Sequence, residues 1–215
     1  MLSGIIWLMV SPFMATIGLC NGICASWADK PLIIRAVGPW LAQQGWLSVA
    51  PGDVLYFTYG RYFVLVYVCI GLGLTGLHQL QTRYVQSVNR FTRFSYWLLL
   101  GSLLIAAGGD FVSYGMGVIS PRAWRAGFGL EMFAWMGVIA GSVLYGIAML
   151  RLHVLPPWTG WILMLGGILL PCMFFDRTFV MYWPNAQLLP YSFAWTILGG
   201  YQLLQRFSTI NHQEI

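Results

Sequence analysis

The amino-acid sequence predicts an all-α integral membrane protein with six transmembrane helices. Of its 215 residues, 59% are hydrophobic and only 8% are charged, and the mean hydropathy is +0.72. Soluble domains carry roughly 25% charged residues, so a soluble chain of this composition would lack the polar groups to cover its surface. In lipid only helices and closed barrels satisfy the backbone, and the apolar runs here are too long and continuous for barrel strands.

The expected helices follow from apolar length, because a spanning helix needs about 20 mostly apolar residues. The length of the chain fits one transmembrane domain, residues 1–215, rather than two domains. The sixth segment gives the weakest signal, since it contains glutamines and Pro190. The expected spans are residues 4–25, 57–79, 95–118, 128–150, 158–175 and 187–205.

The chain begins "MLSGIIWLMVSPFMATIGLC", without a basic n-region or a clear cleavage site, and we expect a retained membrane helix. The connection after it, residues 27–56, is the only long one expected. Its tryptophans, Trp27, Trp40 and Trp46, suit the headgroup zone of a bilayer. Part of residues 31–47 is therefore expected to form a short helix on the membrane surface, with an irregular loop as the alternative.

Weak internal similarity indicates three successive helical hairpins. Helices one, three and five begin near "WLMV", "WLLLG" and "WILMLG", whereas helices two, four and six end in "GLHQLQTR", "AMLRLHV" and "YQLLQRF". Duplication explains this pattern. The alternative is the general preference of membrane helices for tryptophan and arginine at their ends.

The basic residues indicate orientation rather than nucleic-acid binding. The net charge is +5, but the arginines lie singly between apolar runs and form no basic face, which excludes nucleic acid as a partner. The loop "QTRYVQSVNRFTRF" holds three arginines and no acid. Because basic loops stay in the cytoplasm, we expect both termini there, in a bacterial inner membrane.

Asp110 is the feature that most limits function. It lies in "AAGGDFVSYG", residues 106–115, inside the third expected span. An ionised carboxylate there costs a few kcal/mol on insertion scales (~2.5–3.5), so it is expected to face the bundle interior or a wet cavity. Ser113 and Tyr114 follow within about one turn on the same side, together with small alanines.

Other charges gather at the same side of the membrane. Glu131 opens the fourth span and Arg61 opens the second, while Asp176 and Arg177 end the fifth. The expected ligand-binding residues are Arg61, Asp110, Ser113, Tyr114 and Glu131.

Structural alternatives stay open for each of these charges. Asp110 is equally suited to an ion pair with Arg61 or Arg122 inside the bundle. Glu131 lies in a first helical turn, where an acid complements the helix dipole. Asp176 and Arg177 are also typical of an ordinary helix end exposed to water.

No pattern predicts a catalytic residue, a metal site or a cofactor. The histidines, His78, His153 and His212, lie at or beyond helix ends, which disfavours both a catalytic set and haem ligation. No phosphate loop or H-E-x-x-H occurs. Cys20 and Cys24 share a helix face, and small-residue packing explains them better than a soft metal ion.

The leading hypothesis is therefore a non-enzymatic membrane protein. It would bind a small or lipid-like ligand in a polar pocket within one leaflet, or serve as a subunit of a membrane complex with other membrane proteins. One alternative is a small proton-coupled transporter in which Asp110 or Glu131 carries the proton. The other is an intramembrane enzyme that uses both acids for acid–base chemistry.

Overall fold

The structure is a computed structural model, and the part of the chain that it describes is helical and contains no strand, which confirms the predicted all-α class. The described residues are 1–7, 9–10, 17, 26, 28, 32–45, 52–84, 89–117, 119–175 and 189–211.

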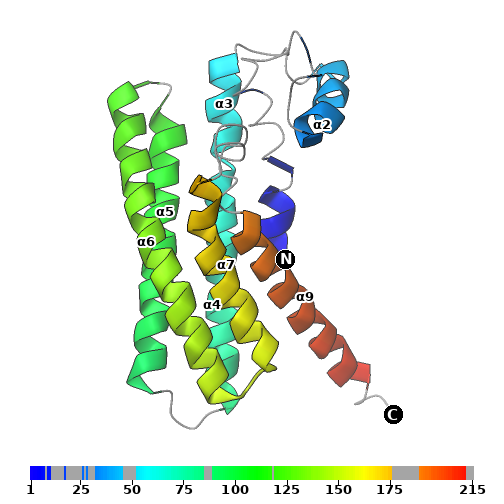
Figure 1. Cartoon of the computed structure of the whole chain (residues 1–215), viewed down its shortest axis with the longest axis vertical. Coiled ribbons are helices and arrows are strands. Elements are labelled where there is room, and N and C mark those ends of the chain that lie inside the picture. The colour runs from blue at the N-terminus through cyan, green and yellow to red at the C-terminus, as the bar shows by residue number, and fades with distance from the viewer. Residues whose placement is uncertain are drawn as a thin grey trace.

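Two long antiparallel helices pack on each other along one side of the molecule: α5 (Arg90–Met116) and α6 (Pro121–Leu152) (Figure 1). Helix α4 (Phe63–Tyr84) packs on α5, and α7 (Pro157–Phe175) packs on α6. Helix α9 (Leu189–Asn211) packs on α7 and also touches α4, so that these helices form one bundle (Figure 1).

Two short helices lie at one end of this bundle. Helix α3 (Gly52–Gly60) packs on α5 and leads into α4 through a turn at residues 61–62, and α2 (Leu32–Gln43) lies toward the same end of the molecule (Figure 1). The helix expected within residues 31–47 is thus present as α2. Its Trp40 is 51% exposed, as a headgroup anchor requires, while Trp27 and Trp46 lie outside the described residues.

Three of the expected spans are confirmed as helices long and apolar enough to cross a membrane. They are Phe57–Tyr84, Arg90–Met116 and Pro121–Leu152. Helices α7 and α9 cover the fifth and sixth expected spans, but the apolar stretch described for α7, Pro157–Leu169, is shorter. Most of the first expected span lies outside the described residues.

Local sequence signals set the ends of the central hairpin. Asn89 caps α5 by accepting a hydrogen bond from the Thr92 amide at 2.8 Å. Ser120 caps α6 in the same way, and Pro121 occupies the first helical position, where its missing N–H is harmless. His153 ends α6 in the left-handed region, with a φ of 52°.

The bundle has a buried apolar core that includes Phe63, Leu74 and Leu99, but its outer surface differs from that of a soluble protein. Large apolar side chains point outward along the long helices, where lipid rather than water is their natural neighbour. Several polar and acidic side chains are instead buried between helices. Strongly exposed apolar residues include Leu72, Leu104, Phe111, Phe133 and Met136, and buried polar ones include Gln81, Asp110, Ser113, Glu131 and Ser142.

Candidate ligand-binding site

A backbone contact between α5 and α6 brings two buried acids, Asp110 and Glu131, together. A Cβ placed on Gly109 would lie 2.7 Å from both the carbonyl oxygen of Gly127 and the amide nitrogen of Glu131. Side chains do not come that close, so only glycine permits this approach. The contact sets Asp110 beside Glu131, with 0% and 1% of their surfaces exposed.

Glu131 is held by an aromatic pair. The Tyr67 hydroxyl of α4 donates to Glu131 Oε1 at 2.7 Å, and Trp135 Nε1 donates to the Tyr67 oxygen at 2.9 Å. All of these side chains are buried. We call Tyr67, Asp110, Glu131 and Trp135 the acid cluster.

Asp110 differs from Glu131 in having no such anchor. Neither of its carboxylate oxygens has a hydrogen-bond partner among the described residues. Its carboxyl group interacts electrostatically with that of Glu131. A buried polar group without a partner is costly, and a proton, a cation or a donor on a ligand would each relieve that cost.

The structure places Arg61 away from Asp110. The exposed Arg61 guanidinium donates to the backbone oxygens of Tyr114 at 3.2 Å and Gly115 at 3.5 Å. These carbonyls belong to the last turn of α5, where helix oxygens lack intrahelical partners. Arg61 therefore caps α5, and the ion pair with Asp110 considered from the sequence is not formed.

The other two expected site residues serve helix packing. The Ser113 hydroxyl donates to the backbone oxygen of Trp124 at 3.2 Å, which ties α5 to α6. The Tyr114 ring lies 6.4 Å from the rings of both Phe57 and Phe63. Both side chains are buried near the acid cluster.

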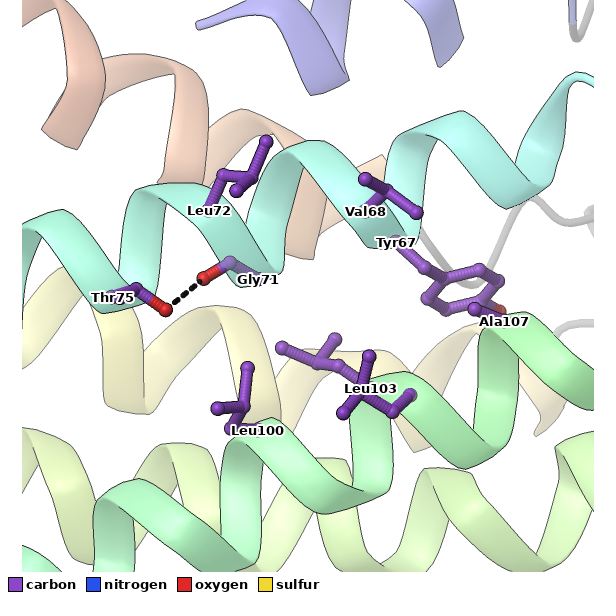
Figure 2. A pocket seen from close by; sticks show the side chains of 9 residues that line it. Tyr67, Val68, Gly71, Leu72, Thr75, Leu100, Leu103 and Ala107 are labelled. Carbon is purple, nitrogen blue, oxygen red and sulfur yellow. Dashed lines mark hydrogen bonds between the residues drawn. The ribbon is translucent and has the colours of Figure 1, made fainter.

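A pocket of about 250 Å³ lies between α4 and α5, directly beside the acid cluster. Figure 2 shows side chains from both helices facing this space, with the Tyr67 ring directed toward Ala107. Of the acid cluster only Tyr67 lines it, and none of the five expected site residues does. The lining residues are Tyr67, Val68, Gly71, Leu72, Thr75, Leu100, Leu103, Leu104 and Ala107.

A second polar cluster lies toward the other end of the bundle. The Tyr145 hydroxyl donates to Gln81 Oε1 at 2.8 Å and lies 3.4 Å from His78 Nδ1. The His78 ring stacks on Tyr96 with centroids 4.0 Å apart, and the Tyr96 hydroxyl lies 3.2 Å from that of Thr75. We call His78, Gln81, Tyr96 and Tyr145 the distal polar cluster.

Sequence inspection did not connect Tyr67, His78, Gln81 or Tyr96 to a site, although Tyr145 lies on the same helical face as Glu131. A tyrosine or histidine on an apolar helix gives no signal until the partner helix is known. Trp135 did have a signal, because it lies one turn after Glu131 on the same helical face.

The described residues contain no group of three or more His, Cys, Asp or Glu side chains suited to a metal ion. Cys69 is a free, partly buried thiol. The other residues that the sequence singled out, Cys20, Cys24, Asp176 and Arg177, lie outside the described residues.

Comparison with known proteins gives no relative: no family model matches the chain, and no curated protein or solved structure matches it significantly.

Proposed function

We propose that this is a multi-pass membrane protein that binds a lipid-like ligand between α4 and α5, next to the acid cluster. One observation supports the proposal above all others. Tyr67 lines the apolar pocket with its ring, while its hydroxyl donates to Glu131 at 2.7 Å. A ligand in the pocket would therefore lie against the hydrogen-bonded network of the acid cluster.

The walls of the pocket favour a hydrocarbon chain. Val68, Leu72 and Leu104 line it and are exposed, so its open side faces the bilayer core. Its volume of about 250 Å³ is below the roughly 300–1,000 Å³ of sites for drug-sized ligands. One chain of a lipid-like molecule suits this space and reaches it sideways from the membrane.

The acid cluster favours a polar group that donates hydrogen bonds. Asp110 offers two acceptor oxygens without a described partner, and Glu131 accepts from Tyr67. A hydroxyl or a protonated amine on the ligand would meet this network at Tyr67, the member of the acid cluster that lines the pocket. The leaflet that holds Asp110 and Glu131 is the one in which this group would lie.

The test measures lipid bound to the purified protein after a bulky residue is placed in the pocket. A Cβ on Gly71 meets only Leu100 Cδ1, at an ordinary 3.5 Å, so Gly71→Leu fills the pocket without displacing backbone. Gly76→Leu is the matched control, because a Cβ there meets nothing within 4 Å. Native mass spectrometry should find a lipid retained by the wild type and by Gly76→Leu, and lost from Gly71→Leu. Equal lipid retention by both variants would reject the pocket as the binding site.

A second candidate, proton-coupled transport, is favoured by Asp110 itself. A fully buried carboxyl group without a described partner is suited to bind and release a proton, as acids do inside many membrane pumps. Infrared difference spectra after a pH jump should contain a carboxylic-acid band that is absent from Asp110→Asn. An identical band in wild type and variant would exclude Asp110 as a proton carrier.

A further inference from the structure

We infer that a buried polar path for protons runs along one face of α6, from the acid cluster to the distal polar cluster, and that it is closed at Val138. The inference rests on the second candidate function, proton-coupled transport. It assigns the residues along which protons would move and the residue that blocks them. The path follows one stripe of the helix, with members three or four residues apart. All of these positions are at most 2% exposed: Glu131, Trp135, Val138, Ser142 and Tyr145.

Each polar member of the stripe has a polar partner on another helix. Glu131 is bonded to Tyr67 of α4 at 2.7 Å. Near the middle, the Ser142 hydroxyl lies 3.0 Å from the hydroxyl of Tyr191 on α9. Beyond it, Tyr145 donates to Gln81 and approaches His78, both on α4.

The chemistry of these groups suits proton transfer. Carboxyl, hydroxyl and imidazole groups both donate and accept, so each passes on one proton as it receives another. No group is changed after one passage, and one positive charge has crossed the path. Trp135 donates only, so it holds Tyr67 in place instead of carrying a proton.

Each end of the path holds a titratable group, fully buried at the acid cluster and half-buried at the distal polar cluster. At one end Asp110 and Glu131 interact electrostatically within the acid cluster. At the other end the half-buried His78 lies between Tyr96 and Tyr145, with the guanidinium of Arg93 near enough to act on it. Histidine is the side chain best suited to exchange protons near neutral pH.

Val138 closes the path. On the acid side the last proton-carrying group is the Tyr67 hydroxyl, which lies 2.9 Å from Trp135 Nε1. Trp135 and Ser142 are seven residues apart, which is about 10 Å along the helix. That gap exceeds the ~3 Å of a hydrogen bond, so protons cannot pass without water. The only member of the stripe within the gap is the apolar Val138, whose backbone oxygen accepts from Ser142 at 2.6 Å.

The experiment opens this point and measures proton entry into proteoliposomes with a pH-sensitive dye, with valinomycin and potassium to balance charge. Val138→Ser removes apolar volume and adds a hydroxyl, which makes room for a hydrogen-bonded water. The proton leak should rise about tenfold over wild type, since each ~1.4 kcal/mol off a barrier gives a factor of ten. Val143→Ser, a substitution of the same kind on α6 but off the stripe, should leave the leak at the wild-type rate.

A second substitution identifies the route of the leak. Adding Glu131→Gln or His78→Phe to Val138→Ser should return the leak to the wild-type rate, since each removes one end of the path. The inference is overturned if Val138→Ser does not leak, or if its leak is insensitive to both end variants. Val138→Thr replaces Val138→Ser if the latter does not fold, with the same outcomes. If the infrared spectra contain a band from Asp110 but none of these variants leaks, the path is rejected. Proton binding by Asp110, the second candidate function, then remains supported.

Discussion

Gly109 of α5 and Gly127 of α6 meet backbone to backbone, and this contact positions both intramembrane acids. A Cβ on Gly127 would lie 2.5 Å from the carbonyl oxygen of Gly109, and the reverse contact is 2.7 Å. Lipid gives helices little hydrophobic reason to associate, so close packing through small residues becomes a main source of attraction. The same contact that joins the helices sets Asp110 next to Glu131.

Alanine at this contact should therefore be costly. Gly109→Ala or Gly127→Ala forces the two backbones apart, and overpacking of this kind typically costs ~1–3 kcal/mol. We expect a lower melting temperature in detergent for both variants. The matched controls are Gly108→Ala and Gly129→Ala on the same helices, where a Cβ meets nothing within 4 Å. Those controls should melt at or above the wild-type temperature, since alanine favours helix over glycine by ~1 kcal/mol. Equal melting of contact and control variants would show that the helices do not meet at these glycines.

Loss of the Tyr67 hydroxyl should destabilise the acid cluster. Tyr67→Phe leaves Glu131 without its donor and Trp135 without its acceptor. A buried group that loses its partner costs ~1–3 kcal/mol. The melting temperature should fall, whereas Tyr62→Phe, at an exposed position in the turn before α4, should leave it unchanged. If Tyr67→Phe melts like the control, the hydrogen bonds of the acid cluster contribute no stability.

Asp110 and Arg61 should act independently. Asp110→Asn removes a buried carboxylate that has no described partner, so the melting temperature should stay the same or rise while ligand or proton binding is lost. Arg61→Gln removes the donor to the last turn of α5 and should lower the melting temperature slightly. The change in the free energy of unfolding of the double variant should equal the sum of the two single changes within ~0.3–0.5 kcal/mol. Recovery of stability in the double variant, with unchanged ligand content, would instead reveal a structural ion pair.

Orientation can be tested with single cysteines in a background lacking Cys20, Cys24, Cys69 and Cys172. The loop that follows α4 is rich in arginine, so a cytoplasmic position is expected. In intact cells Ser87→Cys should resist a membrane-impermeant thiol reagent, and Ser48→Cys should react. The opposite pattern would invert the proposed topology.

The sequence by itself determined the helical class and the position of the long central helices. Both follow from composition and from apolar length, which are one-dimensional quantities. The expected spans 95–118 and 128–150 correspond to α5 and α6, although α5 begins earlier, at Arg90, and ends at Met116, and α6 extends beyond its expected range at both ends. Caps such as Asn89 and Ser120 extend these helices into polar sequence that a hydropathy window excludes.

The burial of Asp110 was also foreseeable, because a carboxylate cannot face lipid. The contacts made by Arg61 and Glu131 were not foreseeable from the sequence. Arg61 has the opposite charge to Asp110 and was expected on the same side of the membrane, yet it caps the end of α5. Glu131 instead accepts a hydrogen bond from Tyr67 of α4. Sequence spacing places residues along one helix, but the rotation of each helix against its neighbours depends on packing. Here the Gly109–Gly127 contact sets that rotation between α5 and α6, and only the tertiary structure contains it.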